Sequence, residues 1–278
     1  MHAGFDPDPA CFFCIQKTET SGKEKERSLR LPDGEVYVGL RDQKVVVVGG
    51  SSGFGLEVAR MALAEGAAVV IGGRSQDRLD KALKILSAVS SQVSGEIVDA
   101  ASVESLCSFF AKVGEYDHLV STVGGAMGGG FLQADVQQIR SAMEEKFFHN
   151  LQLAQIGSEK IRAVGSITFT GGTGGRPHTA SGAYLGNAGI LTLAESLASE
   201  LAPRVRVNVV APTWTVTPFW DKITAEEREG IRSYFNQTVP LGRTAEIEEV
   251  ASTYVFLMKN GFINGQQIAV DGGVMLRM

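Results

Sequence analysis

A cluster of glycine and serine residues near residue 50 could bind a phosphate group. The stretch Gly49-Gly50-Ser51-Ser52-Gly53-Phe54-Gly55 follows four consecutive valines and precedes an amphipathic segment that begins at Leu56. Glycines allow a tight turn and let the backbone approach a pyrophosphate closely, and a helix that starts there offers unpaired N–H groups. Between a buried strand and a helix, this spacing predicts a dinucleotide site. A purely structural loop is the alternative.

The residues after the next expected strand indicate which dinucleotide would bind. Gly72-Gly73-Arg74-Ser75 stands there, and no Asp or Glu occurs between Ala67 and Gln76. An acidic residue at this place binds the ribose 2′-hydroxyl of NAD, whereas an arginine accommodates a 2′-phosphate. Arg74 therefore favours NADP(H), with a solvated surface charge as the alternative.

These groups need a framework of strands and helices, and the sequence predicts one. Short runs rich in Val and Ile are typical of strands buried in a parallel sheet, and segments with one apolar face are typical of helices. Their alternation predicts an α/β fold, a single-domain Rossmann-like doubly wound parallel sheet with helices on both faces. We expect strands at 44–49, 67–72, 95–98, 118–123, 166–170, 205–210 and 267–270, and helices at 56–66, 76–90, 103–113, 136–162, 184–202 and 246–259.

The composition argues against several other classes of protein. The 278 residues are 44% hydrophobic and 21% charged, which excludes global disorder. No apolar run reaches the roughly 18 residues of a membrane-spanning helix. A net charge of −5 argues against nucleic-acid binding, and three cysteines exclude a disulfide scaffold. We expect a cytoplasmic protein without a membrane or nucleic-acid partner.

The N-terminal residues 1–40 are expected to form a flexible extension ahead of one domain at 41–278. Residues 15–30 are polar and dense in charge, and nothing before them has the pattern of a secretory signal. Cys11 and Cys14 have metal-ligand spacing, but two ligands cannot hold zinc unaided, so the pair is interpreted as incidental. No metal is expected.

From about residue 40 onward the chain resembles the short-chain dehydrogenase/reductase family. The glycine turn matches the family's glycine motif, and Arg206-Val-Asn-Val-Val-Ala-Pro212 matches the strand that leads to the nicotinamide, although Thr213 replaces the usual glycine. Ser121-Thr-Val-Gly124 stands where the family has Asn-Asn-Ala-Gly. The segments Gly242-Arg243, Glu249-Val-Ala251, Gly265-Gln266 and Asp271-Gly-Gly273 match its C-terminal pattern.

This resemblance implies a set of residues that contact the cofactor. Asp99 matches the residue that contacts the adenine, and Thr217 matches the threonine that binds the carboxamide or the phosphates. The full expected set is Gly49, Ser51, Ser52, Gly53, Phe54, Gly55, Arg74, Asp99, Ala100, Val123, Gly124, Thr170, Pro212, Thr213, Thr215 and Thr217.

The resemblance fails at the residues that transfer the proton in this family, a serine, a tyrosine and a lysine. Its serine position falls on Gly172. Two registers remain open for its tyrosine and its lysine four residues later: Ala183 with Asn187, or Tyr184 with Ala188. Neither register supplies a lysine, and a phenol with a pKa near 10 is a poor base at neutral pH without a nearby cation.

Another group would then have to handle the proton. The candidates are Tyr184, His178, whose imidazole titrates in a useful range, and Lys146, which stands at the family's helix asparagine position with Asn150 one turn further on. Packing, a surface loop and a solvated helix charge are the respective structural alternatives.

A lid is expected at about residues 213–240, where the family covers its substrate. Aromatic residues there would form a wall suited to flat apolar or cyclic ligands, or would serve lid packing or a subunit contact. Arg176 could bind an anionic substrate group. The expected substrate pocket consists of Met127, Phe131, Gly172, Arg176, Trp214, Phe219 and Trp220.

Three functions remain open. The first is an NADP(H)-dependent oxidoreductase that uses a non-standard proton donor on a small carbonyl, alcohol or imine compound. The second is a non-redox cyclase or isomerase on the same scaffold, and the third is a non-catalytic NADP(H)-binding protein. The resemblance also implies a homodimer or homotetramer formed through the two long helices and the C-terminal segment.

Overall fold

The computed structural model describes residues 39–125, 128–221 and 223–277. The expected N-terminal extension, Cys11, Cys14 and Met127 therefore lie outside the described residues, apart from Gly39 and Leu40. No described helix is long and apolar enough to span a bilayer.

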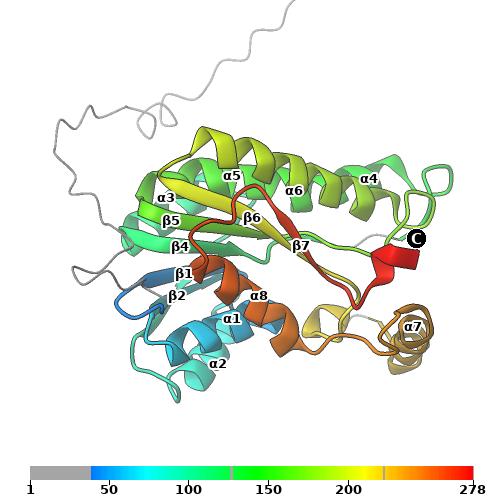
Figure 1. Cartoon of the computed structure of the whole chain (residues 1–278), viewed down its shortest axis with the longest axis horizontal. Coiled ribbons are helices and arrows are strands. Elements are labelled where there is room, and N and C mark those ends of the chain that lie inside the picture. The colour runs from blue at the N-terminus through cyan, green and yellow to red at the C-terminus, as the bar shows by residue number, and fades with distance from the viewer. Residues whose placement is uncertain (1–38, 126–127, 222, 278) are drawn as a thin grey trace, which may run out of the picture.

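Seven parallel strands form a single sheet in the order β3-β2-β1-β4-β5-β6-β7, which confirms the doubly wound architecture (Figure 1). The strand order reverses between β1 and β4, so the carboxyl ends of these two strands flank the position where such sheets bind ligands. The strands are β1 (Lys44–Val48), β2 (Ala68–Gly73), β3 (Val93–Ile97), β4 (Tyr116–Ser121), β5 (Ile161–Thr170), β6 (Val205–Pro212) and β7 (Gln267–Val270).

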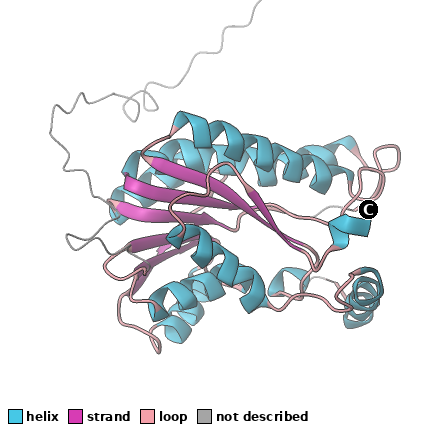
Figure 2. Cartoon of the chain, viewed as in Figure 1, coloured by secondary structure: helices cyan, strands magenta, loops and turns pink. Residues whose placement is uncertain are grey.

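Helices cover both faces of the sheet (Figure 2). One face packs against α1 (Gly53–Ala64), α2 (Gln76–Leu86) and α8 (Ile247–Lys259), and the other against α3 (Val103–Val113), α5 (His149–Gly157) and α6 (Ser181–Glu200). The valine run of β1 serves both cores, because Val45 and Val47 point to the first layer and Val46 and Val48 to the second. Successive side chains of a strand alternate between faces, which explains why this strand is apolar throughout.

Two segments differ from the predicted elements. The helix expected at 136–162 is divided into α4 (Val136–Met143), a π-helical turn (Glu144–Phe148) and α5, and β5 begins at Ile161. The segment expected as a lid contains α7 (Ala225–Thr238), a helix without a fully buried residue. A reciprocal capping box between Thr224 and Glu227 starts α7, so local capping rather than an apolar face marks this helix in the sequence.

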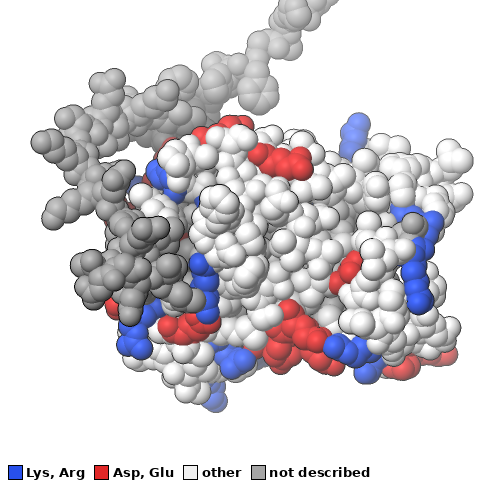
Figure 3. All heavy atoms as spheres, in the orientation of Figure 1, with Lys and Arg blue, Asp and Glu red and all other residues white. Residues whose placement is uncertain are grey.

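Charges of both signs are interspersed over the face drawn in Figure 3, mostly along its lower edge, while the middle of that face is largely uncharged.

Candidate functional site

The glycine turn after β1 is shaped by contacts that exclude side chains. Gly49 has a φ of +89°, and a Cβ there would overlap the Oγ1 atom of Thr122, which donates a hydrogen bond to the Gly49 carbonyl at 3.2 Å. A Cβ at Gly55, in the first turn of α1, would overlap that same carbonyl oxygen. The turn therefore packs closely against Thr122 and the start of α1. Because it lacks side chains at these two positions, a ligand can approach its backbone closely. Sequence reasoning missed the contribution of Thr122.

The first turn of α1 keeps its N–H groups available. Ser52 is the N-cap residue, and its side chain makes no capping hydrogen bond. Thr217 lies against the same turn, because a Cβ at Gly53 would lie 3.6 Å from Thr217 Cβ. The expected residues Ser51 to Gly55 and Thr217 are therefore brought together around one helix N-terminus, which suits an anionic group.

The ends of β2 and β3 carry the next two expected residues. Arg74 is exposed immediately after β2, and Ser75 behind it caps α2. After β3, Asp99 accepts a hydrogen bond from the Ala101 N–H at 3.1 Å, and Ala100 is buried between them. Each side chain lies beyond the carboxyl end of its strand, as predicted.

The loop after β4 is fixed by a buried network. The Ser121 hydroxyl donates to Asn150 Oδ1 at 2.5 Å, and Asn150 Nδ2 donates to the carbonyl oxygens of Val123 at 3.2 Å and Lys146 at 2.7 Å. Thr170, at the end of β5, donates to the Ser121 carbonyl at 2.7 Å. Asn150 thus connects α5 and the π-helical turn before it to the end of β4, next to Gly124.

Lys146 is the buried cation of this region. The residue is only 7% exposed, and its Nζ donates to the Gly171 carbonyl at 3.3 Å. Burial lowers the pKa of the amine from 10.5 to about 8. The sequence suggested a helix charge as the structural alternative, and this burial does not fit a solvated side chain.

The orientation of α6 shows which of the two stripes left open by the sequence faces the end of β5. A Cβ at Gly172 would lie 2.8 Å from Asn187 Nδ2, so Asn187 faces the end of β5, with Ala183 one turn before it. Tyr184 and Ala188 are exposed on the next stripe of the helix. The stripe that faces the strand ends therefore carries the amide of Asn187 and the methyl group of Ala183, and it has neither a lysine nor a tyrosine side chain.

The other candidate donors lie in a surface loop. His178 and Arg176 are both exposed between β5 and α6. This loop pairs with the loop after β4, since Gly129 N–H donates to the Thr179 carbonyl and Ser181 N–H to the Gly129 carbonyl, each at 2.9 Å. Phe131 is close in sequence to this pairing and is 46% exposed.

The segment after β6 is built on threonines and aromatic rings. Pro212 ends the strand, and Thr213, Thr215 and Thr217 are all buried. Trp214 stacks on Phe235 of α7 with ring centroids 5.8 Å apart, and Trp220 packs beside Trp214 at 6.0 Å. Phe219 contacts Trp220 and remains half exposed.

Three buried polar atoms in the loops after β5 and β6 have no hydrogen-bond partner in the described chain: Thr173 Oγ1, Thr213 Oγ1 and Trp214 Nε1. Leaving such groups unpaired costs about 1–3 kcal/mol each. Thr213 Oγ1 lies where a Cβ of Gly174 would be, at 2.7 Å, so these atoms belong to the junction of the β5 and β6 loops.

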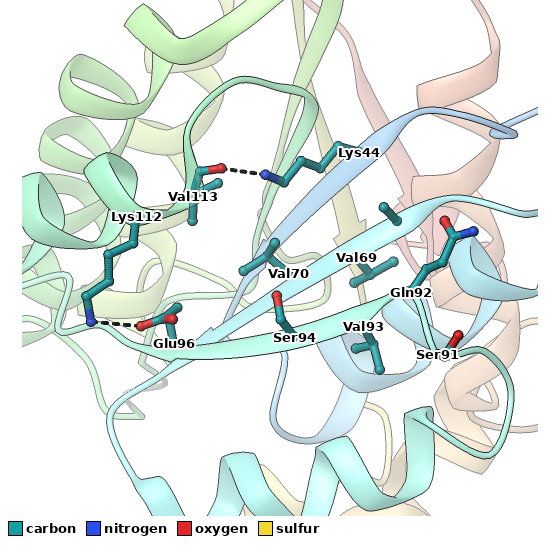
Figure 4. A pocket seen from close by; sticks show the side chains of 11 residues that line it. Lys44, Val69, Val70, Ser91, Gln92, Val93, Ser94, Glu96, Lys112 and Val113 are labelled. Atoms are coloured by element: carbon teal, nitrogen blue, oxygen red, sulfur yellow. Dashed lines mark hydrogen bonds and ion pairs between the residues drawn. The ribbon is translucent and has the colours of Figure 1, made fainter.

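A separate hollow of about 360 Å³ lies at the opposite end of the strands (Figure 4). Lys112 pairs with Glu96 at 2.9 Å beside it, and Lys44 Nζ donates to the Val113 carbonyl. Lys44, Ala68 and Val93, which line this hollow, begin β1, β2 and β3, whereas Glu96 lies opposite Gly72 nearer the carboxyl end of β2. Among the described residues, no group of three or more His, Cys, Asp or Glu could hold a metal ion.

The comparisons with known proteins agree with this geometry. Residues 48–275 match the family described as enoyl-(acyl carrier protein) reductase. A short-chain dehydrogenase/reductase of Gibberella fujikuroi, fsr5, is 31% identical over 263 residues, covering 87% of this chain and 98% of the relative.

Two solved structures are similar as well. A small-chain dehydrogenase in complex with NADPH has 28% identity and a TM-score of 0.69, covering 84% of this chain and 99% of that one. MalC Reductase/Diels-Alderase of Malbranchea aurantiaca has 25% identity and a TM-score of 0.76, covering 86% and 98%. The resemblance drawn from the sequence is therefore confirmed: the chain belongs to the short-chain dehydrogenase/reductase family.

Proposed function

We propose that this protein is an NADP(H)-dependent oxidoreductase acting on a small apolar or cyclic carbonyl, alcohol or imine compound. The observation that carries the proposal is the glycine turn, which opens α1 beside the point where the strand order reverses. Side chains at Gly49 and Gly55 would overlap Thr122 and the Gly49 carbonyl, so the turn needs both glycines, and the Thr213 hydroxyl at the end of β6 is unpaired. The residues present therefore fit a dinucleotide.

Each part of the site has a task in holding such a cofactor. The first turn of α1 and Thr217 would hold the pyrophosphate, Asp99 the adenine, and Gly124, Thr213 and Thr215 the nicotinamide end. When bound, the cofactor supplies or accepts the hydride, while the protein supplies orientation and a path for the proton.

The preference for NADP(H) rests on Arg74. Its guanidinium is exposed beyond β2, where it is free to pair with a 2′-phosphate. An arginine fork suits phosphate geometry. The similar dehydrogenase solved with NADPH supports this preference.

We propose that the proton donor differs from the family's usual one. In the register of Ala183 and Asn187, Gly172, Ala183 and Asn187 stand at the positions of its serine, tyrosine and lysine, and the contact of Asn187 with Gly172 supports this register. The aromatic group Trp214, Trp220 and Phe235 supports a flat or cyclic substrate.

Cofactor binding is tested by titrating the purified protein with NADPH and with NADH while following energy transfer from tryptophan to nicotinamide. We expect tight NADPH binding and weak NADH binding. A panel of cyclic carbonyl compounds, two of them flat (menadione and isatin) and one puckered (cyclohexanone), is then screened for NADPH oxidation. Absence of binding to either cofactor would refute the oxidoreductase proposal.

A non-redox cyclase or isomerase is the second candidate. The missing serine and lysine and the aromatic lid favour it, and the similar MalC protein is titled both a reductase and a Diels-Alderase. The two are separated by measuring product and NADPH oxidation together: an oxidoreductase consumes one NADPH per product, and a cyclase consumes none. NADPH binding without any turnover would indicate a non-catalytic binding protein.

We further propose a cytoplasmic homodimer or homotetramer. Val136, Phe148, Tyr184 and Leu185 are exposed apolar or aromatic residues of the α4-to-α6 region, and Phe262, Met275 and Leu276 are exposed near the C-terminus. Light scattering coupled to size exclusion gives the oligomeric state directly, and a monomer at micromolar concentration would contradict the assembly.

A further inference from the structure

We propose that Lys146 is the proton donor of this site, and that its side chain reaches the reacting centre from the π-helical turn between α4 and α5 by lying against α6 at Gly186. The inference rests on the proposed oxidoreductase function. It assigns proton donation to Lys146, because Ala183 and Asn187, on the stripe of α6 that faces the strand ends, have no acidic proton to give.

The route of the side chain is set by a glycine. At Gly186 of α6, a Cβ would lie 2.9 Å from Lys146 Cβ and 2.8 Å from Lys146 Cγ. These atoms lie near the root of the lysine side chain, so they cannot swing aside as a flexible tip would. Any residue larger than glycine at 186 would therefore block the path.

The amine ends at the carboxyl ends of two central strands. Its Nζ donates to the Gly171 carbonyl after β5, and a Cβ at Gly124 after β4 would lie 3.1 Å from that same nitrogen. Gly124 is part-exposed, so the amine lies beneath a thin layer of backbone at the ligand side of the sheet. Gly172, which faces Asn187, is the next residue after Gly171, so the amine lies beside the position from which the serine is missing.

The hydrogen bonding leaves capacity for a ligand. An ammonium has three donors, and the described structure gives Nζ one acceptor, the Gly171 carbonyl. Burying an ammonium with incomplete pairing is unfavourable, and such groups concentrate at functional sites. A substrate oxygen at the strand ends would supply a second acceptor.

The surroundings of Lys146 are almost uncharged. From α6 the amine's side chain meets Gly186, and from the β4 and β5 loops it meets Gly124 and Gly171. The neighbouring carboxylate is Glu145 on its own turn, which lies against Gly125. Desolvation is the cause that lowers the pKa of Lys146 to about 8, which brings its proton close to neutral pH, where general acids are most effective.

For a carbonyl substrate, a hydride supplied by NADPH forms the new C–H bond at the carbonyl carbon while the C=O π bond breaks. The oxygen takes a proton from the Lys146 ammonium, which leaves a neutral amine, an alcohol and NADP⁺. Solvent then returns a proton to the amine.

The first test follows the amine itself and needs no substrate. The full chain is labelled with carbon-13 at lysine Cε, and the Lys146 signal is identified as the one missing from Lys146→Met. We expect this signal to titrate near pH 8, well below the other lysines, and to shift when NADPH is added. An ordinary lysine titration, or a signal that NADPH leaves unmoved while it binds, would overturn the inference.

The second test separates the donor role from the cofactor site. Lys146→Met fills the same path without a proton, Lys146→Arg keeps the charge, and Lys112→Met, which removes a surface lysine paired with Glu96, is the matched control. With menadione or isatin, whichever the unmodified protein reduces, Lys146→Met should lower kcat at least 100-fold and change NADPH affinity less than tenfold. Lys112→Met should retain full turnover.

The outcomes distinguish failure of the proposed oxidoreductase function from failure of the proposed role of Lys146. If the unmodified protein fails to bind NADPH, the proposed function and the role of Lys146 both fall. If it binds NADPH and turns over while Lys146→Met keeps kcat within threefold, only the role of Lys146 is refuted.

Discussion

Lys146 and Gly186 lie on neighbouring helices so closely that a Cβ on the glycine would lie 2.8 Å from Lys146 Cγ. A lysine from the turn before α5 thereby lies against α6, and its amine ends beside the carbonyl of Gly171. Lys146 thus lies at the same strand ends as Asn187, which faces Gly172, the residue after Gly171.

The contact at Gly186 predicts a size limit. Gly186→Ala should destabilise the protein by about 1–3 kcal/mol, since overpacking forces the side chain or the backbone to move. Gly230→Ala in α7 is the matched control, because nothing lies within 4 Å of a Cβ there, and it should stabilise by about 0.5–1 kcal/mol through helix propensity. Urea denaturation measures both. Equal effects of the two substitutions would contradict the packing argument.

Lys146 should also reduce stability at neutral pH. Burial lowers the pKa of the Lys146 amine from 10.5 to about 8. Between about pH 8 and pH 10.5 the amine is therefore mostly neutral in the folded protein and mostly protonated in the unfolded chain. Stability from this group therefore rises with pH across that window. Lys146→Met should be more stable than the unmodified protein at pH 7, by at most about 3 kcal/mol, and the gain should shrink by pH 10. A pH-independent difference in the free energy of unfolding would argue against a buried ammonium.

Arg74 should determine the choice of cofactor. Arg74→Glu should weaken NADPH binding about 10- to 100-fold, the range expected when a charged hydrogen bond is lost, and should leave NADH binding the same or stronger. Arg78→Ala, one helical turn further on, serves as the comparison and should have a smaller effect. Dissociation constants from the energy-transfer titration decide the matter; equal losses for both cofactors would show that Arg74 does not contact the 2′-phosphate.

Tyr184 offers a contrasting prediction. Its side chain is 43% exposed on the stripe of α6 next to the one that faces Gly172. Tyr184→Phe should therefore change kcat less than threefold and leave the pH profile of kcat in place. A loss of turnover comparable to that of Lys146→Met would indicate that the Tyr184 phenol, and not Lys146, is the proton donor.

The framework could be predicted because its signals are local. The valine run of β1 and the glycine turn after it indicated a buried strand and a phosphate-binding helix start, and the structure places both at the switch point of the sheet. α7 had no such signal: its residues are polar and none is fully buried, so only the Thr224–Glu227 capping box marked it.

The arrangement around Lys146 could not be derived from spacing. Lys146 and Gly186 are distant in sequence, and their contact depends on how α6 packs against the turn before α5. The register of Tyr184 was open for the same reason, since a rotation of about 100° separates neighbouring positions on a helix. Packing of α6 against Gly172 settles which stripe faces the strand ends.

The most direct test of the account is a crystal structure of the full protein with NADPH. We expect the pyrophosphate on the first turn of α1, the 2′-phosphate beside Arg74, and the nicotinamide end over Gly124 with Lys146 Nζ within hydrogen-bonding reach of the ligand side of the site. A complex in which the nicotinamide lies elsewhere, or in which the Lys146 amine is sealed from the bound ligands, would contradict it.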